Sequence, residues 1–434
     1  MTNSGDATYS SARGARAVSF VVVEGMASLG NALSVFALEI WIYESTGSYG
    51  LFALMTLLGV LPGVLVAPFS GPLVDRLPSG IILLGCSVAV ILLSLSFALA
   101  LRYGPSSTMA AGWLIIGLAT IQTVRWPTLV STVSKLSTLQ NIGRITAFEE
   151  AMEASIVVAA PVLGVWLLTH GGILPVVGIL SISYLSSIVG VFLFGLPRAI
   201  EADHFRSIFS NYLTNFVEYV AFGFRWIRQR RHLLRLLIFV CVLNFGASVF
   251  VTIQTPLAAS MFDATRAATI VSMGGVGWAA GSLFTVLVGG VRPPIRAIYL
   301  GTLGITFGMA IYGLSSSPLQ CEVGAFVFAF FHPIVNTAIQ LIWRRETPVQ
   351  EQGAVFSVRR MVSTALGPLG IAASVPLSVH LIGPAMERAS TQLALNRLWA
   401  TPTAMRLGAT LVATSLMMAV AVIAFRCRRF LNTP

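Results

Sequence analysis

The stretch that decides the fold is YGLFALMTLLGVLPGVLVAPFSGPLVDRLPSG, which runs from Tyr49 to Gly80. Residues 49–69 carry no charged side chain, and an apolar run of this length is what an α-helix needs to cross a lipid bilayer. The run then meets glycines, prolines and the charged pair Asp75 and Arg76. The pattern predicts a membrane-spanning helix that ends in a short polar turn at one face of the membrane.

The rest of the chain has the same apolar character. Of its 434 residues, 56% are hydrophobic and 10% are charged, whereas about 25% of an average soluble domain is charged. This composition excludes an ordinary soluble protein and predicts an all-α membrane protein, because a β-barrel would show alternating runs of about ten residues. Twelve transmembrane helices are expected, near residues 18–43, 49–74, 80–101, 109–132, 145–169, 172–196, 233–259, 268–291, 295–315, 319–343, 355–382 and 405–426.

The positive charge of the chain, +11 at neutral pH, predicts its topology. Nucleic acid is one partner of a basic chain, but in membrane proteins Lys and Arg gather in the cytoplasmic loops. Most of them lie inside if both termini are cytoplasmic, so we expect that orientation and no nucleic-acid partner. Aromatic residues alternate with arginines in the longest polar stretch, which predicts an amphipathic helix on the inner membrane surface. The expected parts are a cytoplasmic N-terminal tail (1–17), a six-helix bundle (18–196), this cytoplasmic amphipathic linker (197–232), a second six-helix bundle (233–426) and a cytoplasmic tail (427–434).

The two halves of the chain repeat. RWPTLVSTVSKLSTLQNIGRITAFEEAMEASIVVAAPVLG in the first half matches FHPIVNTAIQLIWRRETPVQEQGAVFSVRRMVSTALGPLG in the second. Both stretches have a proline at their third position, and they end on Gly164 and Gly370. A shorter match, LSVF against ASVF, begins at Leu33 and Ala247. A repeated six-helix unit is a feature of one large class of secondary transporters, whose binding site lies between the halves.

Two of these motifs resemble those of a known family. GPLVDR at Gly71–Arg76 is similar to the loop after helix two of the major facilitator superfamily, roughly G-x-L-a-D-R, and APVLG at 160–164 resembles its antiporter motif. Within that superfamily, WIYESTGSYGLFALMTLLGVLPGVLVAPFSGPLVDR and RQRRHLLRLLIFVCVLNFGAS look most like the bacterial macrolide-efflux and siderophore-export branch. The resemblance implies two pseudo-symmetric six-helix bundles working by alternating access. It also implies that the conformational change depends on Gly71, Asp75, Arg76, Pro161 and Gly164.

Ionisable residues inside the expected spans are candidates for function, because they are costly in a membrane. Glu24 lies near the inner end of the first span on one stripe with Ser28, Asn31 and Glu39, and it could simply snorkel or cap. Glu39 could be an interfacial acid or a proton carrier, since desolvation favours the neutral form of a carboxyl. We expect Arg125 in the fourth span to pair with Glu150 and Glu153, which share its depth in the fifth. That pair is either structural or a proton switch, so the proton-coupling candidates are Glu39, Glu150, Glu153 and Arg125.

Other polar residues are candidates for binding a substrate. His332, Asn336 and Gln340 recur every four residues and so share one helix face, which must point at protein or water rather than lipid. His332 could also be a satisfied core residue, and no second His or Cys lies at metal-ligand spacing, so no metal is expected. By the resemblance, spans one, four, seven and ten line a central cavity, whose candidates are Asn31, Gln122, Asn244, Gln254, His332, Asn336 and Gln340.

The sequence contains no motif of an enzyme or an ATPase. There is no GxxxxGK[ST] phosphate loop, GxSxG, HExxH or dinucleotide fingerprint, so we expect no catalytic residue, no cofactor and no direct use of ATP. The expected protein is a monomeric secondary transporter of the bacterial inner membrane, whose partners are a small-molecule substrate, protons and the bilayer. Proton-coupled efflux of an amphipathic compound (a macrolide, a peptide antibiotic or a siderophore) is favoured. The alternatives are an importer or facilitator of a small nutrient and a non-transporting membrane receptor.

Overall fold

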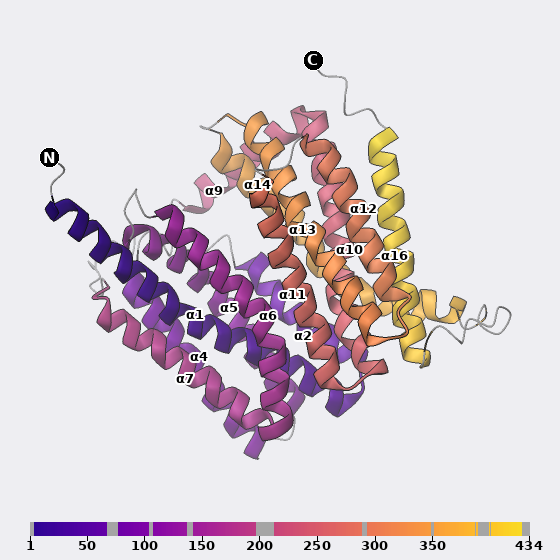
Figure 1. Ribbon diagram of the computed structural model, residues 1–434, viewed down its shortest axis with the longest axis horizontal. Helices are drawn as coiled ribbons and strands as arrows, with labels where there is room; N and C mark the ends of the chain where they lie inside the picture. Colours follow the sequence, from indigo (N-terminus) through magenta and orange to yellow (C-terminus); the bar gives the residue numbers. More distant parts are fainter. Residues whose placement is uncertain are drawn as a thin grey trace. The chain divides into compact units, whose positions relative to one another are not determined.

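The structure is a computed structural model of the whole chain, and it is almost entirely helical (Figure 1). It describes residues 4–66, 77–103, 107–136, 142–196, 212–288, 293–348, 351–386, 388, 399 and 401–427, among which there is no β-strand. The helices in the first half are α1 (Ser4–Thr46), α2 (Tyr49–Leu65), α4 (Ser79–Tyr103), α5 (Ser107–Leu136), α6 (Ile142–Gly171) and α7 (Ile173–Leu193). Those in the second half are α9 (Tyr212–Gln229), α10 (Arg231–Met261), α11 (Ala264–Leu287), α12 (Pro294–Gly313), α13 (Pro318–Glu346), α14 (Gln352–Pro376) with the π-helix η2 (Leu377–Ile382), and α16 (Pro402–Cys427).

The apolar segments form helices that are long enough to cross a membrane. Within the described residues, 10 helices meet that requirement by length and composition. The apolar helix α2 is shorter, at 17 residues, and α5, at 30 residues, stands where the fourth span was expected. The predicted fold class, an all-α membrane protein, is therefore confirmed.

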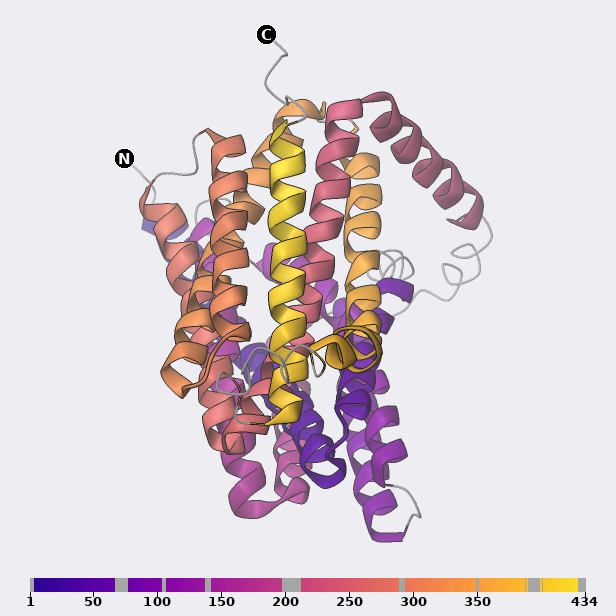
Figure 2. The ribbon, with the colours of Figure 1, turned by 90° about the vertical axis from the view of Figure 1, so that its right-hand side faces the viewer.

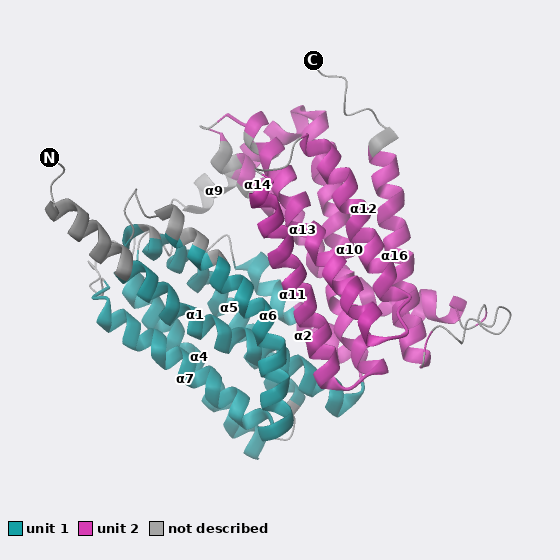
Figure 3. Ribbon diagram, in the orientation of Figure 1, with its two compact units in different colours: residues 1–47, 58–210 teal, residues 48–57, 211–434 magenta. Residues whose placement is uncertain are grey.

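The chain divides into two compact units (Figure 3). Unit 1 comprises residues 1–47 and 58–210, and unit 2 comprises residues 48–57 and 211–434. In unit 1, α1 packs against α5, α6 and α7, and α4 packs against α5 and α7. In unit 2, α10 packs against α11, α14 and α16, and α13 packs against α11 and α12. In each unit, one long helix, α1 or α10, thus packs against three other helices of the same unit.

A close helix contact recurs in the two units. A Cβ atom at Gly164 of α6 would lie 2.7 Å from the backbone oxygen of Leu33 in α1. A Cβ atom at Gly370 of α14 would lie 2.5 Å from the backbone oxygen of Phe245 and 3.1 Å from Cβ of Ser248, both in α10. Backbones can approach this closely only where a side chain is missing. The repeated sequence ending on the two glycines therefore corresponds to a repeated packing of two helices.

The amphipathic segment of the linker forms α9, which is attached to unit 2. The indole N–H of Trp226 donates a hydrogen bond to the carboxylate of Glu351, next to the start of α14. The guanidinium of Arg230 lies over the Trp226 ring, 3.6 Å from its centroid. Trp226 is itself buried, so one aromatic side chain fixes the C-terminal end of α9. A position on the inner membrane surface stays a prediction.

Candidate functional site

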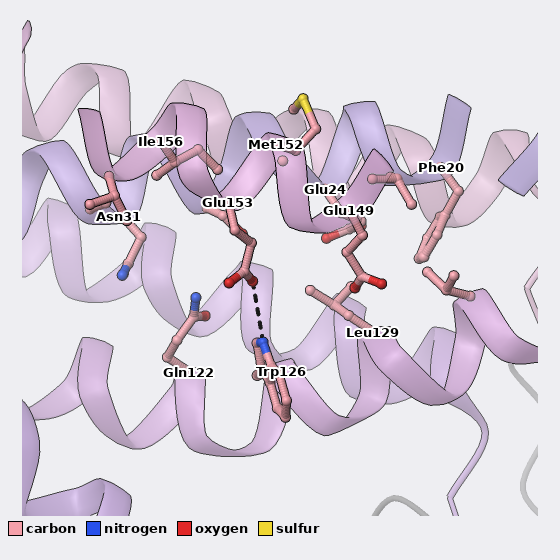
Figure 4. A pocket seen from close by; sticks show the side chains of 16 residues that line it. Phe20, Glu24, Asn31, Gln122, Trp126, Leu129, Glu149, Met152, Glu153 and Ile156 are labelled. Carbon is pink, nitrogen blue, oxygen red and sulfur yellow. Dashed lines mark hydrogen bonds between the residues drawn. The ribbon is translucent and has the colours of Figure 1, made fainter. Parts of the chain in front are cut away.

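A cavity of about 200 Å³ lies inside unit 1, among α1, α5 and α6. Its walls are mainly apolar, and its polar groups come from all three helices (Figure 4). Ser28 lies one turn from Glu24 on α1, and Asn31 lies one turn further, so the expected stripe faces the cavity. The lining residues are Phe20, Val21, Glu24, Gly25, Ser28, Asn31, Ala32, Gln122, Trp126, Leu129, Val133, Glu149, Met152, Glu153, Ile156 and Val157.

A buried ion pair lies beside the cavity, which is lined by its acidic member, Glu24. The guanidinium of Arg125 on α5 donates to the carboxylate of Glu24 on α1, and Arg125 is 0% and Glu24 3% exposed. The other carboxylate oxygen of Glu24 accepts from Ser187 Oγ at 2.8 Å. The guanidinium also donates to Ser28 Oγ at 3.4 Å and lies 5.1 Å from the centroid of the Tyr184 ring. The pair thus connects α1, α5 and α7, and it offsets the large cost of burying each charge alone.

This pair corrects the expectation for Arg125. Its partner is Glu24, which was expected to snorkel or cap near a helix end, and not Glu153 of the next helix. The carboxylate of Glu153 instead accepts from the indole N–H of Trp126 at 3.3 Å (Figure 4). The side chain of Glu150 lies outside the described part of the structure.

Amide and carboxyl groups occupy the rest of the cavity. Asn31 on α1 and Gln122 on α5 point into it, and Asn31 Oδ1 and Gln122 Oε1 are buried without a hydrogen-bond partner (Figure 4). Glu149 and Glu153 enter from α6. Among these described lining residues there is no Lys or Arg, and the ionisable ones are the three glutamates Glu24, Glu149 and Glu153. Glu39 does not line the cavity, since it follows Glu24 by about 22 Å along α1 at 1.5 Å per residue.

Two of the candidates in unit 2 lie at contacts between helices. Asn244 on α10 donates from Nδ2 to the carbonyl oxygen of Ser363 at 2.9 Å and so ties α10 to α14. The backbone carbonyl oxygen of Gln254 accepts from the hydroxyl of Tyr312 at 2.6 Å, a contact that does not involve the Gln254 side chain.

His332 stacks on Trp278, with ring centroids 5.1 Å apart, and its Nδ1 is buried without a hydrogen-bond partner. Asn336 and Gln340, one and two turns further along α13, are exposed. The expected polar face of α13 is therefore part core and part surface.

The motif residues divide between described and undescribed parts of the chain. Pro161 and Gly164 both lie in α6, and Gly164 makes the close contact with α1 described above. Gly71, Asp75 and Arg76 lie outside the described residues.

A family model matches most of this chain. The model describes the Major Facilitator Superfamily, and it matches residues 20–371. The chain belongs to the major facilitator superfamily. Like other members, this superfamily protein is a multi-pass membrane protein that serves as a transporter, which implies a small-molecule substrate and a surrounding bilayer.

Solved structures of other transporters share the fold. One is a bacterial homolog of the human lysosomal transporter Spinster, in an inward-facing and unoccupied conformation, at 13% identity and a TM-score of 0.67, covering 97% of this chain and 99% of that one. The nucleoside transporter NupG is 12% identical with a TM-score of 0.65, covering 96% and 98%. The peptide transporter POT in complex with sulfate is 11% identical with a TM-score of 0.66, covering 94% and 95%. Identities this low show the fold alone, and no match was found among proteins with curated descriptions.

Proposed function

We propose that this superfamily member is a proton-coupled exporter of a basic, amphipathic compound. It would act as a single chain in the bacterial inner membrane, by alternating access, with both termini in the cytoplasm. The observation that carries the proposal is the acceptor-rich cavity of unit 1, into which Glu149 and Glu153 project beside the ion pair of Glu24 and Arg125.

The charge of the cavity favours a cationic substrate. Arg125 offsets Glu24, whereas Glu153 adds a carboxyl group that belongs to neither ion pair among the described residues. The Trp126 ring offers a face for a cation, and the apolar walls suit the rest of an amphipathic molecule. Among the compounds considered, a macrolide or a peptide carrying an amine fits these groups, and an acidic siderophore does not.

Export of the substrate is coupled to proton entry if the substrate and protons compete for the same carboxyl group. Glu153 is an exposed side chain that accepts the 3.3 Å hydrogen bond from Trp126, so either a proton or an amine can reach it. We assign Glu153 the role of exchanging a proton for the amine of the substrate. Glu150, on the same helix, and Glu39, further along α1, are the other acids assigned to proton coupling. Arg125 holds the adjoining wall in place through Glu24.

Transport in proteoliposomes tests this proposal. We expect a proton gradient to drive uptake of erythromycin, a basic macrolide, into vesicles in which the cytoplasmic face of the protein points outward. Collapse of the gradient should stop this uptake. Glu153→Gln should abolish the gradient-driven uptake, because an amide side chain does not take up a proton at neutral pH. Glu44→Gln, the same change at an exposed position outside the cavity, should leave the rate unchanged.

Other outcomes would contradict specific parts of the proposal. Erythromycin flux that is unaffected by collapsing the gradient would exclude proton coupling and favour the facilitator alternative. A Glu153→Gln variant with full gradient-driven transport would exclude the role given to that residue. Faster transport of an acidic catecholate siderophore than of erythromycin would exclude the basic substrate class.

A further inference from the structure

We propose that unit 2 carries a binding site for one anionic phospholipid in a groove between α10 and α16. The two helices run side by side (Figure 2). The groove has a volume of about 230 Å³. It is lined by Ile238, Phe239 and Val242 of α10 and by Ala421, Ala424 and Phe425 of α16, with Arg235 at one end.

The groove continues a single face of α10 that changes from basic to apolar. Arg231, Arg235, Ile238 and Val242 follow one another at steps of four, three and four residues, so they lie on one side of the helix. Arg231, Arg235 and Ile238 are exposed. A phospholipid has the same order of groups, a charged phosphate followed by apolar chains.

The two arginines are available to a phosphate. Among the described residues no carboxylate forms an ion pair with Arg231 or Arg235. A guanidinium holds phosphate oxygens by paired, charge-assisted hydrogen bonds, and its apolar stem can lie along the helix while its charge reaches the headgroup region. Basic pockets between transmembrane helices bind anionic headgroups in this way. Arg225 and Arg228, exposed on the preceding helix α9, add positive charge.

The apolar part of the groove has room for an acyl chain. Ala421 and Ala424 are small, and they leave space beside the stacked rings of Phe239 and Phe425, whose centroids are 4.6 Å apart. Tyr299 of α12 lies against Phe425 at 5.8 Å and supports the ring from the far side. A rigid aromatic floor beside small residues suits one flexible chain better than a bulky side chain.

Native mass spectrometry of the full-length protein in detergent tests the site. The probes are phosphatidylglycerol and phosphatidylcholine with identical acyl chains, and the measured quantity is the dissociation constant of the first bound lipid. We expect wild-type protein to bind phosphatidylglycerol about tenfold more tightly than phosphatidylcholine. Arg235→Gln should weaken phosphatidylglycerol binding about fivefold, at about 1 kcal/mol per basic residue, and should weaken phosphatidylcholine binding less, because the choline cation offsets the phosphate charge. Arg266→Gln, which removes an exposed arginine at the start of α11, is the matched control.

Further variants and probes separate the parts of the site. Ala421→Phe should weaken both lipids by filling the groove, whereas Val286→Phe, at a side chain that is 74% exposed on α11, should weaken neither. Glycerol phosphate, which has the headgroup chemistry without the chains, should not displace bound phosphatidylglycerol. Equal affinity for both lipids in the wild type, or the same loss in Arg235→Gln as in Arg266→Gln, would overturn the proposal. Displacement by glycerol phosphate would instead show a site for free phosphate, which also contradicts a lipid site.

Discussion

Replacing Gly164 with valine should destabilise unit 1 strongly. The new Cβ would lie 2.7 Å from the backbone oxygen of Leu33, and neither atom belongs to a flexible side chain that could turn away. Overpacking costs about 1–3 kcal/mol where side chains can adjust, so we expect at least about 3 kcal/mol where two backbones must separate. In a unit of about 200 residues, such as unit 1, each kcal/mol corresponds to a shift of about 2–4 °C in the melting temperature. The expected fall is therefore about 10 °C, measured by thermal unfolding of the purified protein.

The matched control is valine at Gly178 in α7. That position also lies within a helix, but no atom outside the local helix lies within 4 Å of its Cβ position. Gly178→Val should stay within a few degrees of the wild type, because only the difference in helix propensity changes. Gly370→Val should be as damaging as Gly164→Val, because the Phe245 oxygen lies 2.5 Å from its Cβ position. Equal melting temperatures for Gly164→Val and Gly178→Val would contradict the close contact of α6 with α1.

Removing either partner of the buried ion pair should destabilise unit 1, but the two substitutions should do so by different amounts. Glu24→Gln leaves the Arg125 guanidinium buried and charged, since arginine does not lose its proton in proteins. Arg125→Met leaves Glu24 with the hydrogen bond from Ser187, and a carboxyl can become neutral by taking up a proton. We expect a loss of about 3–5 kcal/mol for Glu24→Gln and a smaller loss for Arg125→Met.

The double variant completes a thermodynamic cycle. Glu24→Gln combined with Arg125→Met removes both charges, so it should be more stable than Glu24→Gln alone, with a coupling of at least about 1 kcal/mol. Thermal unfolding of the four proteins under one set of conditions measures the coupling. Additive losses in the double variant would show that the two side chains do not interact, and would contradict the pair.

The helices and the repeat could be predicted from the sequence because both depend on patterns along the chain. Apolar runs of membrane-crossing length gave the helices, and Gly164 and Gly370 marked the repeated contact because only glycine allows that approach. The ends of helices were harder to predict. The first helix was expected from residue 18, whereas α1 begins at Ser4, and this moves Glu24 from the end of a helix to its interior.

The partner of Arg125 was not predicted, because the depth of a residue in the membrane does not determine the direction in which its side chain points around the helix. Residues of α6 share its depth, but so does Glu24 on α1, and α1 packs against both α5 and α6. The signal was present in the stripe of Glu24, Ser28 and Asn31, spaced by four and three residues on α1. An arginine within the membrane requires an acid, and the acid already lying on a polar stripe was the better candidate.

The ion pair also determines how unit 1 responds to voltage. Glu24 and Arg125 together carry no net charge, so a membrane potential does no net work on the pair when the helices that hold it move. A proton on Glu24 would leave one positive charge in its place, on which 100 mV across the full bilayer does about 2.3 kcal/mol of work. A single protonation of Glu24 would thus turn the pair from electrically silent to voltage-sensitive.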